Sequence, residues 1–170
     1  ARKLEAAGAE AIVLATNTMH KVAPASEAAV KVPFLHIAEA TAQAICAQGL
    51  KRPALMATAY TMEQDFYKER LVRHGLEVII PDEADRAETH RIIYDDLCKG
   101  IVTETSRASY IAIAERLQAK GADCLILGCT EVGMLLNAGN VPMPVFDTTL
   151  IHVEAAVEFA LGSRKLMAAE

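Results

Sequence analysis

The sequence predicts an α/β protein whose strands run parallel. Short apolar runs of strand length alternate along the chain with segments of helical periodicity, which is the pattern of a parallel sheet with crossover helices. Hydrophobic residues make up 52% of the chain and aromatic residues only 5%, as expected for a core of Ala, Val, Ile and Leu. With 170 residues, the chain is long enough for one full core or two small lobes.

The first part of the chain is expected to begin with the end of a helix, which Gly8 closes. That opening has no N-cap, and we therefore expect that the sequence begins inside a larger protein. A helix-like segment then runs to about residue 29, after the turn at 16–20. The other expected elements before residue 49 are strands at 11–15 and 32–37 and a helix at 39–48.

A linker at 49–53 is the best candidate for a boundary between two lobes. Beyond it, Thr61 and Gln64 have the spacing of a capping box that opens a helix. The expected strands are 54–58, 76–80, 124–128 and 145–147, and the expected helices are 61–73, 87–99, 103–120, 134–136 and 149–161.

Composition and charge exclude several classes of protein. The net charge of −5 and the lack of a basic cluster argue against a nucleic-acid partner, and the apolar runs are too short to span a membrane. No signal peptide is visible, so the four cysteines are expected to be reduced thiols of a cytoplasmic protein. Their spacing matches no zinc motif, and no metal is expected.

The stretch 125–133 carries the strongest chemical signal. A buried strand ends at Gly128, and Cys129, Thr130 and Glu131 follow where a helix is expected to begin. A thiol there would face the positive end of a helix dipole, which favours thiolate, and the free N–H groups of Thr130 and Glu131 would suit a carboxylate. The alternative is a buried structural cysteine followed by a helix cap.

A second stretch, 12–18, has the same design as 125–131. Each is an apolar strand, a small residue, a hydroxyl or thiol, and then polar residues. Two such turns in two lobes are expected to face each other across a cleft.

At these turns the chain resembles the aspartate/glutamate racemase family, most closely its broad-specificity and L-aspartate/glutamate-type amino-acid racemases. Residues 128–131 match the family pattern G-C-T-[EDH], and 16–20 match C-N-T-x-H except that Thr16 replaces cysteine. The resemblance covers nearly the whole chain, but a first strand with its glycine-rich loop and the following strand are missing.

The resemblance implies a fold of two similar α/β lobes with the active site between them, usually in a homodimer. Residues 1–48 would be the C-terminal half of the first lobe, which is incomplete in this chain. Residues 49–148 would form the second lobe, and 149–170 a C-terminal helix returning to the first.

The resemblance also implies a racemase that works on a small amino acid without pyridoxal phosphate or another cofactor. Inversion needs an acid and a base on opposite faces of one carbon. Cys129 stands where the family has the cysteine that faces the α-hydrogen of the L-enantiomer, and Thr16 stands in place of the other cysteine. Because a threonine hydroxyl is a far weaker acid than a thiol, we expect an asymmetric enzyme that deprotonates the L-substrate readily and the D-substrate poorly.

Substrate binding is implied for Asn17, Thr18 and Thr130, which match positions that hold the α-carboxylate and amino groups. Plain N-capping by these residues is the alternative. Glu131 is expected to orient the substrate ammonium or to activate Cys129, or else only to complement a helix dipole.

Three further residues are weaker candidates. Thr58 and Thr61 lie at another strand-to-helix turn that would line the cleft, and Lys99 is placed to reach a side-chain carboxylate, unless it is a solvated helix end. His20, the last residue of the first motif, is expected either to support Thr16 or Asn17 or to be a satisfied core histidine.

Two other functions compete with the racemase. One is a single-cysteine decarboxylase of the same superfamily, because only one motif cysteine is present. The other is a non-catalytic amino-acid binder or an inactive, truncated family member.

Overall fold

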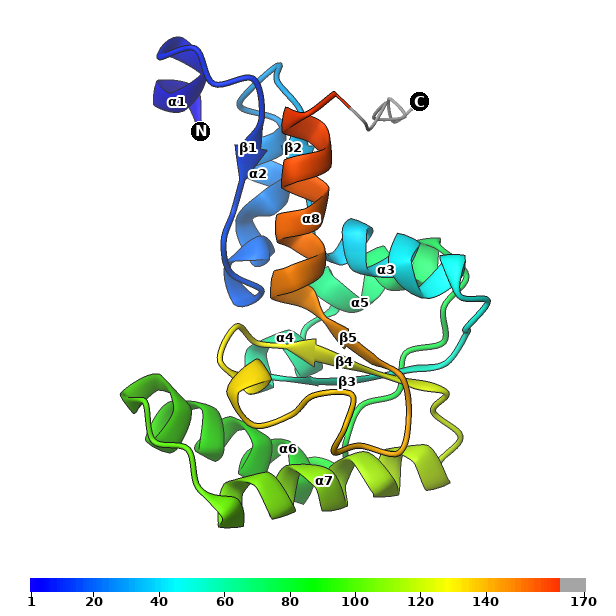
Figure 1. Cartoon of the computed structure of the whole chain (residues 1–170). Helices are drawn as coiled ribbons and strands as arrows, with labels where there is room; N and C mark the ends of the chain where they lie inside the picture. Colours follow the sequence, from blue (N-terminus) through cyan, green and yellow to red (C-terminus); the bar gives the residue numbers. More distant parts are fainter. Residues whose placement is uncertain (163–170) are drawn as a thin grey trace.

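The computed structural model describes residues 1–162 and contains two parallel β-sheets (Figure 1). In the smaller sheet, β1 (Ile12–Val13) pairs with β2 (Phe34–Leu35). In the larger one, β4 (Cys124–Gly128) lies between β3 (Pro53–Ala57) and β5 (Val145–Asp147). All of these pairings are parallel, so the predicted α/β fold with parallel sheets is confirmed.

Helices cover both faces of the larger sheet, as Figure 1 shows: α6 and α7 lie on one side and α3, α4 and α5 on the other. Helix α8 leaves β5 and runs along β2 and α3. The helices are α1 (Arg2–Ala6), α2 (Ala23–Glu27), α3 (Ile37–Ala47), α4 (Ala59–Glu63), α5 (Asp65–Arg73), α6 (Glu83–Arg91), α7 (Glu104–Ala119) and α8 (Thr148–Ala160), with shorter turns η1 (Thr18–Val22), η2 (Ile92–Asp96), η3 (Leu97–Lys99) and η4 (Val132–Met134).

Strand β4 forms the centre of the core because both of its faces are buried. Its alternate side chains point to opposite faces of the sheet. Leu125 and Leu127 pack in the cluster with η2 and α7, and Cys124 and Ile126 pack in the cluster with α3 and α5. A continuous apolar run is therefore what this position in the sheet requires.

The predicted strand at 76–80 is wrong except for one bridge between Ile79 and Ala54. The segment does run beside β3, since Glu77 donates to the Lys51 carbonyl and Ile79 to the Pro53 carbonyl. A longer parallel ladder would need N–H donors at Pro53 and Pro81, and proline has none. Two prolines thus restrict the pairing to a single residue.

The predicted capping box at Thr61 is also wrong. Helix α4 begins at Ala59, and the side chain of Thr58 accepts the hydrogen bond from the Thr61 N–H group. Thr58 comes first after β3, so its hydroxyl starts the helix and leaves Thr61 inside it. Gln64 is instead the N-cap position of α5 and makes no side-chain cap bond.

Two other helix predictions differ from the structure. The helix expected at 87–99 begins earlier, at Glu83, because Asp82 caps it, and beyond Arg91 it continues as a π-helical turn, η2, and a 3₁₀ turn, η3. The helix expected at 134–136 is only the 3₁₀ turn η4. No α-helix therefore begins directly after Cys129.

The predicted last helix at 149–161 is present as α8, but residues 163–170 of the predicted segment 149–170 lie outside the described residues. The boundaries of the two lobes stay a prediction. Within the described part of the chain, no helix is long and apolar enough to cross a membrane.

Candidate active site

Two turns that follow β1 and β4 are joined through Thr148. The Asn17 side-chain N–H group donates to Thr148 Oγ1 over 3.0 Å, and Thr148 Oγ1 donates to the Leu127 carbonyl over 2.8 Å. Leu127 precedes Cys129 by two residues. The structure thus links the turn that carries Thr16 and Asn17 to the strand that carries Cys129.

Asn17 is almost fully buried, with 3% of its surface exposed. Its Oδ1 atom has no hydrogen-bond partner among residues 1–162. A buried carbonyl oxygen without a partner is rare and costly, and it is often a sign of a binding role. Asn17 therefore offers an acceptor for a ligand donor.

The hydroxyl groups of Thr18, Thr58 and Thr61 form a closed triangle. Thr18 Oγ1 lies 2.9 Å from Thr58 Oγ1 and 3.1 Å from Thr61 Oγ1, and the last two are 3.2 Å apart. Three of the predicted site residues, from η1 and from the start of α4, are thus brought together.

Cys129 and Thr130 both donate to one carboxylate oxygen of Glu131. The Cys129 sulfur lies 3.0 Å from Glu131 Oε2, and Thr130 Oγ1 lies 2.6 Å from it. Partial burial of Glu131 would raise its pKa, but these two hydrogen bonds outweigh it and leave the pKa below its ordinary value. The carboxylate is therefore ionised and next to the thiol.

Cys129 is a protonated thiol at neutral pH, contrary to the expected thiolate. Burial, and then the hydrogen bond to the Glu131 carboxylate, raise its pKa to about 12, although the Glu131 N–H group opposes the shift. The helix dipole invoked from the sequence is missing because η4 spans only three residues. The thiol must pass its proton to a neighbour before it acts as a base.

A groove of about 300 Å³ lies between β1 and α8. Thr16 and Thr130 both line it, together with apolar side chains of β1 and α8, including Val13, Val153 and Val157. The two turns that resemble each other in sequence therefore border one space.

The hydrogen bonds described above do not include Lys99, which ends η3. Its side chain is exposed, and its Nζ atom is 3.7 Å from the carboxylate of Asp95. Its role toward a substrate carboxylate stays a prediction. Among residues 1–162, no group of three or more His, Cys, Asp or Glu side chains is arranged to hold a metal ion.

The sequence assigned no role to Thr148 or Thr149. Thr148 connects the two turns, and Thr149 lines the groove with a buried hydroxyl that has no partner in the described part of the chain. The signal was present: both residues directly follow the strand β5, as Thr16 and Cys129 follow theirs at the carboxyl ends of parallel strands.

Comparisons with known proteins agree with this geometry. The family model described as Asp/Glu/Hydantoin racemase matches residues 1–156. A crystal structure of a putative Asp/Glu racemase from Yersinia pestis is 53% identical with a TM-score of 0.89, and the match covers 94% of this chain and 70% of that one. An aspartate racemase homologue from Pyrococcus horikoshii is 35% identical, with a TM-score of 0.85 and the same coverage. The broad specificity amino-acid racemase RacX of Bacillus subtilis is 27% identical over 160 residues, which are 94% of this chain and 69% of RacX. This chain belongs to the Asp/Glu/hydantoin racemase family.

Proposed function

We propose that this protein is a cofactor-independent amino-acid racemase that acts on aspartate, glutamate or a broader set of amino acids. The observation that carries the proposal is the hydrogen bond from the Cys129 thiol to the Glu131 carboxylate, at the end of a strand joined to the Thr16 turn. The name of RacX supports broad specificity, and that of the Yersinia pestis protein supports acidic substrates.

Cys129 is the proposed base for the L-enantiomer. Its proton moves from Sγ to Glu131 Oε2 when the substrate is bound, and the thiolate then removes the α-hydrogen. The electron pair of the broken C–H bond stays on the α-carbon and is delocalised into the substrate carboxylate. The thiol that results returns a proton to the same face unless the other face is protonated first.

Thr16 is the proposed proton donor to the opposite face. Its O–H bond breaks and the proton joins the α-carbon. The resulting alkoxide takes a proton from water, and the proton that Glu131 received from Cys129 neutralises the hydroxide left behind. Because a hydroxyl is a much weaker acid than a thiol, this step is slower than return from Cys129. The L-substrate should therefore exchange its α-hydrogen faster than it inverts.

The remaining predicted residues are proposed to hold the substrate. Asn17 Oδ1, a buried acceptor without a partner among the described residues, suits the substrate ammonium. Thr18 is proposed to accept from Thr58 or Thr61 and to donate to the α-carboxylate, and Thr130, whose hydroxyl proton goes to Glu131, is proposed to accept from the ammonium. Thr58 and Thr61 position Thr18. Lys99 is proposed to meet a side-chain carboxylate, and a cytoplasmic homodimer is proposed as the working form.

Proton NMR in D₂O tests the proposal. L-aspartate, L-glutamate and their D-enantiomers are incubated separately, and loss of the α-hydrogen signal is followed beside chiral analysis of the product. Exchange from the L-forms is expected to exceed inversion, and the Cys129→Ser variant is expected to lose both activities.

Cys124→Ser is the matched control, because Cys124 is a fully buried thiol at the start of β4, the strand that Cys129 follows, and its side chain packs in the core. It should keep the exchange activity of the wild type. Wild-type protein that binds these amino acids without exchanging their α-hydrogen would be a binder, and the proposal would fail.

A further inference from the structure

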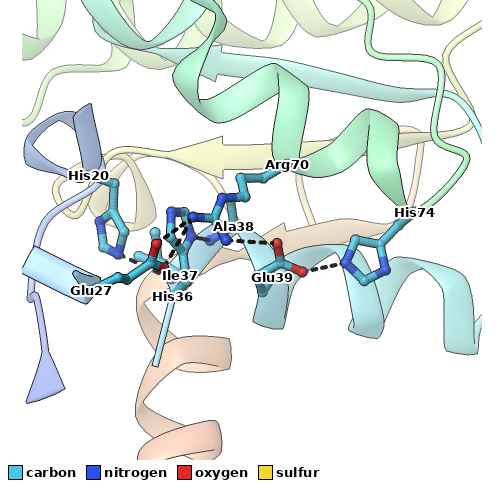
Figure 2. Close-up of polar contacts among 8 residues, drawn as sticks. All are labelled: His20, Glu27, His36, Ile37, Ala38, Glu39, Arg70 and His74. Atoms are coloured by element: carbon cyan, nitrogen blue, oxygen red, sulfur yellow. Dashed lines mark hydrogen bonds and ion pairs between the residues drawn. The ribbon is translucent and has the colours of Figure 1, made fainter. Parts of the chain in front are cut away.

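The ring of His20 is fixed at both nitrogens. Its Nδ1 atom lies 2.6 Å from the Thr16 carbonyl oxygen, and the Ile37 N–H group points at its Nε2 atom over 3.2 Å (Figure 2 shows the second contact). An amide N–H group only donates, so Nε2 must accept. The ring proton therefore sits on Nδ1 and is donated to the Thr16 carbonyl.

We propose that His20 is a positioning residue that holds Thr16 in place for proton transfer to the second face of the substrate. This inference rests on the function proposed above. His20 touches neither the reacting carbon nor the groove, and it acts through the backbone of Thr16.

The position of Thr16 depends on His20 more than the positions of Asn17 and Thr18 do. Asn17 is held by Thr148 and Thr18 by two further hydroxyls. The Thr16 N–H group donates to the Leu14 carbonyl, but the Thr16 carbonyl lies between β1 and η1, outside any helix or strand, and is bound by His20. Because His20 lies on η1, its bond to the Thr16 carbonyl closes the turn onto itself. Loss of that bond should displace Thr16 and leave the other two residues anchored.

The surroundings keep His20 neutral and in this tautomer. Burial, which is the largest effect, outweighs the bond to Thr16 and, with smaller contributions from His152 and the positive charge of Arg70, lowers its pKa to about 4. The guanidinium of Arg70 is itself paired with Glu27 and Glu39 (Figure 2).

Two other histidines pack against the ring, but their own side-chain hydrogen bonds go to residues outside the turn. The ring centroids of His36 and His152 are 4.3 Å and 5.9 Å from that of His20. His36 accepts the hydrogen bond of the Ala38 N–H group as the N-cap of α3, and His152 donates to the Leu35 carbonyl. His36 is therefore a suitable control for a purely structural role.

Substitution of His20 by two different amide residues tests its two hydrogen bonds separately. In His20→Asn the side-chain N–H group takes the place of Nδ1–H and keeps the bond to Thr16. In His20→Gln the side-chain oxygen takes the place of Nε2 and keeps only the bond to Ile37. Both variants lose the ring, so both lose packing to a similar degree.

We expect loss of the bond to Thr16 to lower the rate of inversion and to leave the rate of α-hydrogen exchange almost unchanged. His20→Gln should lower the inversion rate of L-aspartate at saturation at least tenfold, because small misplacements of a reacting group have large effects on rate. Its α-hydrogen exchange through Cys129 should stay within about threefold of the wild type. His20→Asn and the control His36→Asn should retain both rates. Equal loss of inversion in His20→Asn and His20→Gln, or a parallel loss of exchange, would overturn the proposal.

An NMR measurement keeps this inference separate from the proposed function. Long-range ¹H–¹⁵N correlations of the imidazole should show the Nδ1–H tautomer for His20, whether or not the protein turns over an amino acid. An Nε2–H tautomer would overturn the positioning role. Absence of all exchange in the wild type, with the Nδ1–H tautomer present, would instead refute the racemase proposal and leave the contact itself established.

Discussion

Replacing Glu131 by glutamine should change the chemistry of Cys129 in two opposite directions. The pKa of about 12 for Cys129, against an ordinary value of 9.0, leaves about a thousandfold less thiolate at neutral pH. A more basic thiolate is also more nucleophilic, and with a Brønsted coefficient of about 0.4–0.5 the alkylation rate should be roughly 30–60-fold below that of an ordinary thiol.

Glutamine removes the negative charge and leaves burial, the largest cause of the shift, unchanged. The alkylation rate of Cys129 should therefore rise in the variant, but by less than the full 30–60-fold, because burial still holds the pKa up. The α-hydrogen exchange of L-aspartate should fall by about 10²–10⁴-fold, because the thiol loses the carboxylate that accepts its proton. Faster labelling with slower catalysis is not expected from loss of the thiol, and general unfolding, which gives the same pair of changes, would also expose the fully buried Cys124 to labelling.

Iodoacetamide labelling followed by peptide mass spectrometry measures the rate at Cys129, and Cys46 on α3 serves as the internal reference in the same sample. Proton NMR in D₂O measures exchange on the same preparations. Labelling that is unchanged or slower in the variant, or exchange that survives within threefold, would refute the role of Glu131.

Three further predictions concern Thr16, the buried histidines and Gly128. Thr16→Cys should restore a thiol on the second face and raise α-hydrogen exchange from D-aspartate at least about tenfold, measured by NMR, with exchange from L-aspartate little changed. Burial lowers the folded-state pKa of His20 to about 4 and of His36 to about 2, so only the unfolded chain takes up protons as the pH falls below 6.5. The free energy of unfolding in urea should accordingly drop by about 4 kcal/mol from these two groups between pH 7 and pH 5, and His36→Asn should remove about half of that drop. Gly128→Ala should destabilise the fold by about 1–3 kcal/mol in a thermal melt, because the new Cβ would lie 2.8 Å from the side chains of Ala57 and Leu55; an unchanged melting temperature would contradict this packing.

The sequence predicts an element well where one local pattern decides it. Strand β4 is five consecutive buried residues, and its bounds follow from the apolar run and the glycine that ends it. The segment 76–80 has an equally good pattern, but its pairing depends on Pro53, more than twenty residues away, which cannot donate to the ladder. Distant partners decide sheet pairing, and local patterns do not contain them.

The site follows the same rule. Residues at the carboxyl ends of strands could be named from the sequence, because the topology brings such positions to one edge of the sheet. The protonation state of Cys129 could not be predicted from the sequence, since it depends on how deeply the turn is buried and on the length of η4. The bridging role of Thr148 also needed the three-dimensional arrangement, because its two partners lie more than 20 and more than 130 residues away in sequence.

The triangle of threonine hydroxyls has no fixed hydrogen-bond direction. In the racemase proposed above, Thr58 and Thr61 position Thr18, so the direction of this ring decides whether the Thr18 hydroxyl donates or accepts. Each of these hydroxyls either donates or accepts, and rotation of three O–H bonds reverses the direction of the whole ring without moving a heavy atom. A lysine only donates and a carboxylate only accepts, so either one in the place of a threonine would fix the direction of the ring.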